Sequence, residues 1–409
     1  MSKLKIKNFG PVKEGYLENN GWIDIKKITV FIGNQGSGKS TVAKLISTLS
    51  WIEKAMVKGV LRQDELGTYN RFIKQLAYQR IANYIQENTE IEYRGKAFTL
   101  KFKDGNFMAV KAADNGYVLP KIMYVPSDRN FLSVVDRPDK LKNLPLPLYT
   151  FNDEYDSAKM HYANGIELPI NKTVFEYDKF NKLPHIVGEN KSFRIRLSEA
   201  SSGFQSTVPL YLVSKYLTER LHAEDDASLK ENSLEEQRKL EKEIKAILED
   251  NSLSSEIRQA SLRQLSSKRK LSCFINIVEE PEQNLFPSSQ HNVLNALVEY
   301  ANDTAGNTLI MTTHSPYLIN YLTLAVKAFK VCANSSNEEV KKKVSEVVPE
   351  KSILNSSDLV IYELNEKDGI IIKLPDYKGL PSDENYLNNG LAETNQSFAK
   401  LQEIEKGWQ

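Results

Sequence analysis

The segment from Gly33 to Ser40 constrains the fold of this chain more than any other part of the sequence. It reads GNQGSGKS and fits the pattern G-x-x-x-x-G-K-[ST]. The continuous apolar run ITVFI precedes it, and TVAKLISTLSWI, which has helical spacing, follows it. This order favours a buried strand that leads through a glycine-rich loop into a helix, where backbone N–H groups point at phosphate oxygens. The loop therefore predicts nucleotide binding.

Each residue type in this loop has its own task in phosphate binding. Glycine lets the backbone curl, the ammonium group of Lys39 can reach the β- and γ-phosphates, and the Ser40 hydroxyl can bind Mg²⁺. A glycine-rich turn capped by serine is the alternative, but the flanking strand and helix favour a nucleotide site. The residues expected to hold the phosphates are Gly33, Asn34, Gln35, Gly36, Ser37, Gly38, Lys39, Ser40 and Thr41.

Composition argues against several other classes of protein. The 409 residues, 41% of them hydrophobic, suffice for a large core, in one big domain or in two to three smaller units. A formal net charge of +1 gives the whole chain no electrostatic footprint for nucleic acid, and two cysteines support neither a disulfide framework nor a cysteine zinc site. The segment MSKLKIKNFG lacks the apolar stretch of a signal peptide, and no window approaches 18 apolar residues. We therefore expect a cytoplasmic protein without a membrane span.

A second apolar run, FINIV, ends in two acids, Glu279 and Glu280. Paired acids at a strand end can serve solubility alone. Here they follow a run that must be buried, so they should emerge at the carboxyl edge of a sheet, where α/β folds place their ligands. We expect Glu279 to hold Mg²⁺, directly or through water, and Glu280 to orient and deprotonate an attacking water.

Two more polar residues follow apolar strands. His314 comes directly after TLIMTT, and its position at the end of a core strand favours contact with a γ-phosphate over a purely structural role. Arg129 follows IMYV in the segment YVPSDRN. Two interpretations of Arg129 stay open: a local ion pair with Asp128 or Asp136, or the positioning of phosphate or water.

The order of elements predicts an α/β fold with parallel strands, because strand, loop and helix alternate at both ends of the core. Residues 62–87 have the pattern of a helix, and residues 90–112 that of antiparallel hairpins. Residues 223–270 have the pattern of a helical hairpin, for which a solvated insertion without specific function is the simpler interpretation. We divide the chain into an N-terminal half with an antiparallel β-lobe (1–130), an inserted lobe (131–190), a polar loop with its helix (191–222), the hairpin insertion (223–270), the second half of the core (271–320) and a C-terminal region with a hairpin and a final helix (321–409).

The segment Ser198 to Ser206, SEASSGFQS, is a second small polar loop before a helical run. Serine and glycine at a helix start are ordinary caps, but such a loop is also a ready anion site.

Taken in order, the motifs resemble those of a known family. KIKNFGPV, GNQGSGKST, YVPSDRNFLS, SSGFQS, VEEPEQNLFP and TTHSP span residues 1–320. They resemble the ABC-type ATPases of the SMC and RecF group, and more closely the stand-alone ATPases related to OLD-family nucleases and to bacterial anti-phage systems such as PtuA and AriA. The resemblance implies an ABC-type P-loop NTPase fold, with a RecA-like core sheet, an N-terminal antiparallel β-lobe, helical insertions and a small C-terminal α/β region. It also implies hydrolysis of ATP with Mg²⁺, with Lys39, Glu280 and His314 as the catalytic residues.

The resemblance gives the second polar loop a role. In ABC-type ATPases a signature motif closes on the ATP held by a partner subunit. Carried over, this implies contacts in trans from Ser201, Ser202, Gly203 and Gln205, and hence a homodimer or a higher even-numbered homo-oligomer. Ala200 and Phe204 depart from the usual motif, and a bulky aromatic at residue 204 could alter closure or the rate of hydrolysis.

Three functions follow as alternatives. The first is an ATP-driven dimeric sensor or switch of an anti-phage system, with a separate HNH or TOPRIM nuclease as the effector. The second is an OLD-like nuclease, which the roughly 90 residues after Pro316 disfavour because they are few for a TOPRIM domain and contain no D-x-D. The third is a RecF-like DNA repair ATPase, for which the basic runs 268–270 and 341–343 offer small DNA-binding patches.

Overall fold

The computed structural model describes residues 2–67, 70–113, 116–135, 138, 143–222, 271–335 and 337–406. The helical hairpin predicted for residues 223–270 lies outside these residues. Within them, no helix is both long and apolar enough to cross a lipid bilayer.

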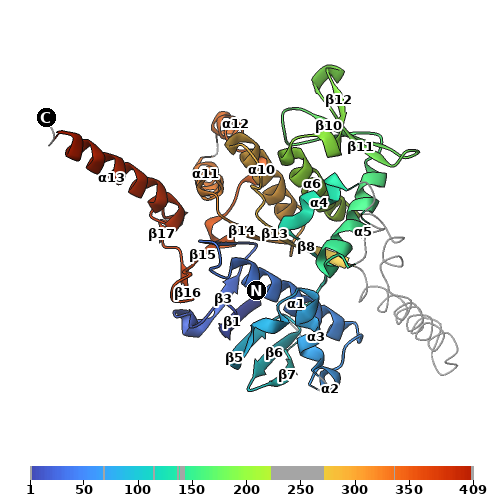
Figure 1. Ribbon diagram of the computed structural model, residues 1–409, viewed down its shortest axis with the longest axis vertical. Coiled ribbons are helices and arrows are strands. Elements are labelled where there is room, and N and C mark those ends of the chain that lie inside the picture. The colour runs from blue at the N-terminus through green and yellow to red at the C-terminus, as the bar shows by residue number, and fades with distance from the viewer. Residues whose placement is uncertain are drawn as a thin grey trace.

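A seven-stranded sheet forms the middle of the molecule (Figure 1). Its order is β2-β16-β15-β4-β14-β13-β8, and the five strands from β15 to β8 run parallel, while β16 is antiparallel to β15. The predicted α/β fold with parallel strands is thereby confirmed. The strands are β2 (Gly15–Tyr16), β4 (Ile28–Gly33), β8 (Leu119–Val125), β13 (Leu271–Glu279), β14 (Thr308–Thr313), β15 (Leu359–Leu364) and β16 (Ile370–Lys373).

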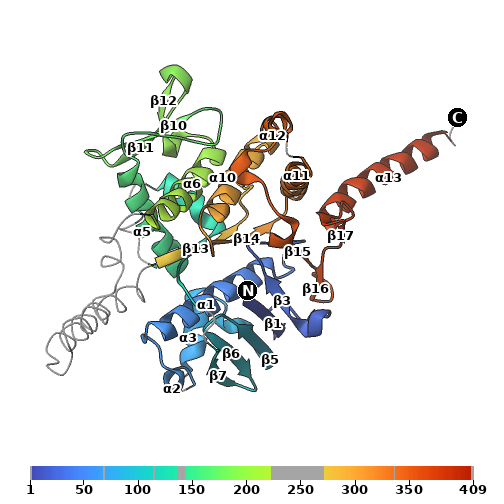
Figure 2. The same ribbon diagram turned by 180° about the vertical axis from the view of Figure 1, so that it is seen from behind.

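Both faces of this sheet are buried, which explains why its strands read as continuous apolar runs. Successive side chains of a strand point to opposite faces. In β4, Ile28, Val30 and Ile32 therefore join one hydrophobic cluster, whereas Phe31 joins the other. Helix α1 (Lys39–Val57) covers the face of Phe31, and helices α6 (Ser202–Arg220), α10 (Pro287–Asp303) and α11 (Pro316–Ala333) cover the opposite face (Figure 2).

An antiparallel sheet packs on the outer side of α1, in the order β3-β1-β5-β6-β7. The hairpins expected over 90–112 form, but the continuous helix expected over 62–87 is wrong. It stops at Tyr78, Arg80 has a left-handed φ of 58°, and a strand begins at Ile85. The elements of this lobe are β1 (Ser2–Phe9), β3 (Ile23–Ile25), α2 (Gln63–Leu66), α3 (Arg71–Tyr78), β5 (Ile85–Arg94), β6 (Phe98–Lys103) and β7 (Asn106–Lys111).

A buried carboxylate fixes α1 to this lobe. Glu53 Oε1 accepts hydrogen bonds from the backbone N–H groups of Ala97 (2.7 Å) and Phe98 (3.1 Å) in the turn between β5 and β6. A Cβ at Gly95 would lie 2.1 Å from that oxygen, so a side chain there would displace the Glu53 carboxylate. Burial raises the pKa of Glu53 even though these donors act against it.

The inserted lobe lies over the opposite face of the central sheet. It contains the helix α5, which packs against α6 and β8, and strands β9, β10 and β11 of a four-stranded sheet in the order β12-β11-β10-β9, whose edge strand β12 comes from the segment expected to form the polar loop and its helix (191–222). A helix of 16 residues was not expected from this Pro- and Asn-rich segment. The elements are α4 (Phe131–Val134), α5 (Leu146–His161), β9 (Ile166–Glu167), β10 (Val174–Asp178), β11 (Leu183–Val187) and β12 (Arg194–Arg196).

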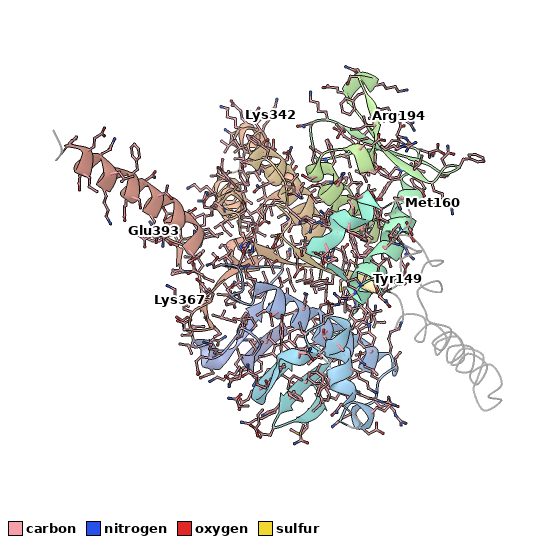
Figure 3. All side chains as sticks on the ribbon, viewed as in Figure 1. Tyr149, Met160, Arg194, Lys342, Lys367 and Glu393 are labelled. Carbon is pink, nitrogen blue, oxygen red and sulfur yellow. The ribbon has the colours of Figure 1, made fainter. Side chains whose placement is uncertain are left out.

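The C-terminal strands return to the central sheet. β15 and β16 form the expected hairpin, and β15 inserts beside β4, so these strands share one sheet with the glycine-rich loop. The final helix α13 (Tyr386–Lys406) extends away from the body, and the side chains around Glu393 stand free of it (Figure 3). The remaining elements are α12 (Glu338–Ser345), β17 (Asp376–Tyr377), β18 (Leu380–Pro381) and the 3₁₀ turns η1 (Asn19–Gly21), η2 (Ala82–Tyr84), η3 (Ser127–Asn130), η5 (Glu189–Lys191), η6 (Leu197–Glu199), η7 (Glu350–Ser352) and η8 (Ser356–Asp358).

Candidate functional site

The glycine-rich loop connects β4 to α1 as predicted. β4 ends at Gly33 and α1 begins at Lys39, with Gly38 as its left-handed N-cap (φ 102°). Gly33 has a φ of 142°, and a Cβ there would lie 2.3 Å from the carbonyl oxygen of Leu364 in β15. Only glycine fits at Gly33, because the adjacent strand leaves no room for a side chain.

The remaining loop residues divide into an exposed tip and a buried base. Asn34, Gln35 and Gly36 are exposed, Ser40 is half-buried, and Ser37, Gly38 and Thr41 are buried. Asn34 donates to Glu366 Oε1 at 3.1 Å, in the turn between β15 and β16. Ser37 Oγ is buried and has no hydrogen-bond partner among the described residues. An unpartnered hydroxyl at this place fits a loop built to bind an additional group.

Lys39 is folded into the loop. Its side chain is 5% exposed, and Nζ donates to the carbonyl oxygens of Gly33 (2.9 Å) and Asn34 (2.7 Å). Burial lowers the pKa of Lys39 to about 8, and the carboxylates of Glu280 and Glu282 only partly oppose this effect. The ammonium group is therefore poorly solvated and gains from an anionic partner.

This pKa predicts coupling between protonation and phosphate binding. Above about pH 8 the nucleotide-free protein loses the Lys39 proton, while phosphate oxygens favour the charged form, so binding takes up a proton. The affinity for Mg·ATP should fall by about tenfold for each pH unit above pH 8. Calorimetric titrations in buffers of different ionisation enthalpy measure this uptake. Lys39→Arg, whose guanidinium stays protonated, should remove the pH dependence, and a pH dependence that persists in it would contradict this assignment.

The two acids and the histidine meet at the carboxyl edge of the sheet. Glu279 ends β13 and pairs in register with Thr312 of β14, which in turn pairs with Phe31 of β4. His314 follows β14, and its Nε2 lies 3.5 Å from Glu280 Oε1. The hydrogen bond from His314 lowers the pKa of Glu280, and the nearby Arg129 and Lys39 add to this effect. Glu280 is therefore ionised at neutral pH, the form that a general base requires.

The backbone at Glu280 is unusual. Its φ is 44°, a left-handed conformation that costs a non-glycine residue about 1–2 kcal/mol. The N–H group of Glu280 donates to the carbonyl oxygen of Thr312 at 2.9 Å. Strain of this kind persists only where surrounding contacts hold the backbone, and it turns the Glu280 side chain towards His314.

Glu279 and Ser40 fit a Mg²⁺ site in part. Glu279 is 4% exposed, and its Oε2 accepts a hydrogen bond from the backbone N–H of Ser127 at 3.1 Å. Its Oε1 is buried and has no hydrogen-bond partner among the described residues. The buried hydroxyl of Tyr124 lies beside it, and burial together with this carboxylate raises the pKa of that phenol. No cluster of three or more His, Cys, Asp or Glu in the described ranges could hold a metal by itself. One carboxylate and one hydroxyl suit Mg²⁺, which completes its shell with waters and phosphate oxygens.

Sequence reasoning missed the role of Glu282. Its side chain is half-buried, and its Oε1 accepts from Thr313 Oγ1 and from the backbone N–H of His314, both at 2.7 Å. Burial raises the pKa of Glu282. The residue fixes the turn that carries His314, and nothing in the local sequence distinguishes it from a solvent-exposed acid.

Arg129 forms no hydrogen bond to Asp128 or to another carboxylate of the described residues; Asp136, the other partner that the sequence suggested, lies outside them. The side chain of Arg129 is 0% exposed, and its hydrogen bonds go to the backbone carbonyl oxygens of Pro126, Ser206, Glu279 and Glu280. A guanidinium that is engaged in this way supports the backbone beneath the acids and supplies no direct contact to a phosphate. Desolvation lowers the pKa of Arg129 to about 10, so it stays charged at neutral pH.

The second polar loop forms the N-terminus of α6. Ser201 is the N-cap, and both Ser201 and Ser202 are exposed. Gly203 is buried, and a Cβ there would lie 2.9 Å from the carbonyl oxygen of Asn284, in the segment after Glu280. Gln205 turns back into its own loop, where its amide donates to the carbonyl oxygens of Ser198 and Ala200. Its side chain therefore closes the loop and does not face outward, unlike the serines.

The glycine-rich loop (residues 33–41) and the second polar loop (residues 198–206) lie apart within one chain. α1 packs on one face of the central sheet and α6 on the other. Among the described residues, no hydrogen bond joins residues 198–206 to residues 33–41. Phe204 packs half-buried against the hydrophobic cluster of α6, so its ring is only partly available at the surface. Ser201 and Ser202 thus lie on the opposite face of the sheet from α1, which follows the glycine-rich loop of their own chain.

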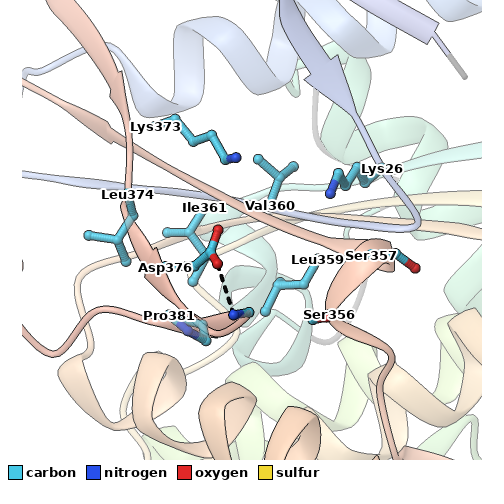
Figure 4. A pocket seen from close by; sticks show the side chains of 11 residues that line it. Lys26, Ser356, Ser357, Leu359, Val360, Ile361, Lys373, Leu374, Asp376 and Pro381 are labelled. Atoms are coloured by element: carbon cyan, nitrogen blue, oxygen red, sulfur yellow. Dashed lines mark hydrogen bonds between the residues drawn. The ribbon is translucent and has the colours of Figure 1, made fainter.

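Two cavities lie at the opposite edge of the sheet, away from the glycine-rich loop. One, of about 190 Å³, lies at the start of β15, where Lys26 and Lys373 face the carboxylate of Asp376 (Figure 4). The other, of about 230 Å³, lies between the N-terminal ends of β8, β13 and β14 and the antiparallel lobe. Neither includes Lys39, Glu280 or His314.

Comparison with known proteins yields structural matches only. No protein-family model matches the sequence, and no curated protein matches it. Among solved structures, the SMC head domain from Thermotoga maritima is 11% identical, with coverage of 92% of this chain and 98% of that chain and a TM-score of 0.36. The SMC head domain bound to the C-terminal domain of ScpA, derived from Pyrococcus furiosus, is 9% identical over 99% and 100%, with a TM-score of 0.38. The dimeric bacterial ABC transporter cassette MJ0796 is 13% identical over 92% and 100%, with a TM-score of 0.28. Because these TM-scores are below 0.5, the assignment of the fold rests on the strand order of this chain.

Proposed function

We propose that this protein is an ATPase that binds Mg·ATP between two copies of the chain. The observation that carries the proposal is the meeting of Lys39, Glu280 and His314 at one sheet edge, while the exposed Ser201 and Ser202 begin a helix on the other face. The glycine-rich loop fits one half of a phosphate site, and the exposed start of α6 fits the other half. Two copies that face each other would combine the glycine-rich loop of one with residues 201–203 of the other.

Each residue has a distinct step in this mechanism. The loop N–H groups and the Lys39 ammonium hold the phosphates and offset their charge. Ionised Glu280 accepts a proton from the attacking water, and His314 beside it donates a hydrogen bond to the γ-phosphate. Mg²⁺, held by Ser40 and Glu279, would supply further charge neutralisation at the phosphates.

The binding of ATP would make this dimer a switch. ATP shifts a two-state equilibrium only by as much as it binds the closed state better, and a site shared by two subunits exists only in the closed state. Hydrolysis removes the shared γ-phosphate and so releases the two copies. The cycle suits a sensor or regulator.

A mixing experiment tests whether the site is shared. Lys39→Ala disables the glycine-rich loop, and Ser202→Arg blocks the exposed start of α6; each homodimer should be inactive. A mixed dimer retains one intact site, formed by Lys39 of the second variant and Ser202 of the first. Equimolar mixing should therefore restore measurable ATPase activity, at most about a quarter of the wild-type rate, because half of the dimers are mixed and each holds one intact site. Activity of the Ser202→Arg homodimer at the wild-type rate would refute the shared site.

We further propose that the chain is the ATPase subunit of an anti-phage system with a separate effector nuclease. The order of the motifs supports this proposal. In the C-terminal region, strands β15 and β16 belong to the central sheet, and the first residue of helix α13 donates a hydrogen bond to Glu363 of β15. Co-purification with the product of a neighbouring gene tests the proposal, and metal-dependent DNA cleavage by the purified chain alone would contradict it.

The RecF-like alternative has less support. The basic run 341–343 lies on α12, where Lys341 pairs with Glu338 (2.7 Å) and Lys343 with Glu339 (3.0 Å). Two of the three lysines in this run are therefore paired with glutamates of the same helix. The run 268–270 lies outside the described residues. DNA affinity that falls steeply with salt would restore this alternative.

A further inference from the structure

Arg129 is the largest fully buried side chain of the described residues, and its bonds join three segments of the chain. Nε donates to Ser206 O (2.9 Å) in the first turns of α6, and Nη1 to Pro126 O (3.1 Å) after β8. Nη1 also donates to Glu279 O (2.7 Å), and Nη2 to Glu280 O (2.7 Å). The planar guanidinium thus aligns α6 with the end of β13.

A buried cation whose hydrogen-bond partners are all backbone carbonyls is not expected from the stability of the fold alone. Burying a charge is expensive, and well-packed apolar residues often replace buried ionic groups without loss of stability. No carboxylate of the described residues forms a hydrogen bond with Arg129; Glu279, Glu280 and Glu282 only lie close enough to offset its charge. The guanidinium instead fixes the directions of its hydrogen bonds, because its donors lie in one rigid plane.

Two of these hydrogen bonds hold the peptide units on either side of the strained backbone of Glu280. The carbonyls of Glu279 and Glu280 flank the left-handed backbone of Glu280, and both accept from Arg129. Ser206 adds a second link, since its Oγ lies 2.9 Å from the carbonyl oxygen of Gln283. A displacement of the first turns of α6 is therefore carried to Glu280 through Arg129 and through the segment that contains Gln283.

We propose that Arg129 is a positioning residue that couples the start of α6 to the catalytic Glu280. This inference rests on the proposed function. Contact of Ser202 with the ATP of the partner subunit would fix the position of α6. Arg129 would then align Glu280 with the ATP of its own subunit. Each site would hydrolyse at full rate only when the other site is also filled, so the ATPase rate would depend cooperatively on ATP.

Arg129→Lys tests this coupling, because lysine keeps the charge but loses the planar set of donors. We expect kcat to fall about 10- to 100-fold and the Hill coefficient for ATP to fall from about 2 to about 1. The dissociation constant of ATP in the Lys39 site should change by less than about threefold, because Arg129 does not contact that loop. Ser133→Ala is the matched control: it removes a 2.7 Å bond to the neighbouring carbonyl of Gln205 but has no link to Glu280, so kcat and the Hill coefficient should stay at wild-type values.

Ser206→Ala provides a second measurement if Arg129→Lys does not fold. It removes the link to Gln283 while Arg129 stays in place, and it should also lower the Hill coefficient. A lower melting temperature of Arg129→Lys with kcat and cooperativity unchanged would overturn the inference, as would a loss of ATP affinity equal to the loss in kcat. A wild-type protein without ATPase activity would instead refute the proposed function itself.

Discussion

Glu280→Gln is expected to bind ATP with wild-type affinity and to hydrolyse it about 10²- to 10⁴-fold more slowly. Glutamine keeps the size and the hydrogen-bonding capacity of the side chain but cannot accept the proton of the attacking water. The pKa of Glu280 is held low by His314, so the loss should be present across neutral pH and not only at its alkaline end. Phosphate release under saturating Mg·ATP measures the rate.

The same variant should accumulate as a closed dimer, because ATP that is not hydrolysed continues to bridge the two copies. Light scattering coupled to size-exclusion chromatography, with and without Mg·ATP, reports the mass. Glu393→Gln, on the exposed helix α13, is the matched control and should keep both the wild-type rate and the wild-type mass. A monomeric mass of Glu280→Gln at saturating Mg·ATP would argue against ATP-bridged dimers.

Lys39→Ala is expected to weaken ATP binding by at least about 100-fold. A hydrogen bond to a charged group contributes about 1.5–3 kcal/mol, and the desolvated Lys39 ammonium can make more than one to the phosphates. Lys44→Ala, one turn further along the same helix, is the control and should bind normally. Fluorescent-nucleotide titration measures both variants.

The folded state should tolerate Lys39→Ala, since the substitution removes a buried charge along with two hydrogen bonds to carbonyls. We expect the melting temperature without nucleotide to stay close to wild type, whereas the stabilisation by ATP should disappear. If Lys39→Ala is still stabilised by ATP as strongly as the wild type, the glycine-rich loop is not the main nucleotide site.

The parts of the site that the sequence predicted depend on local pattern. β4, the glycine-rich loop and α1 form one continuous segment, and Glu280 and His314 each come within two residues of a strand end. Apolar runs and loop glycines are sufficient to place such residues at one sheet edge. Their catalytic roles stay predictions.

What the sequence did not predict depends on contacts between distant segments. Arg129 bonds to Ser206 and to Glu280, 77 and 151 residues away, and Glu282 bonds to Thr313, 31 residues away. No local periodicity encodes such partners. β15 is a similar case: its hairpin with β16 was predicted, but its position beside β4 was not, because strand order follows from packing of the whole sheet.

The position of β4 has a consequence for synthesis of the chain. Its two neighbours in the sheet are β14 and β15, which leave the ribosome about 280 and about 330 residues later. At about 5–20 residues per second, both edges of this buried strand stay unpaired for tens of seconds. The glycine-rich loop can therefore reach its final shape only after β15 has been synthesised. Nascent chains should depend on chaperones during this interval, because an unpaired apolar strand promotes aggregation.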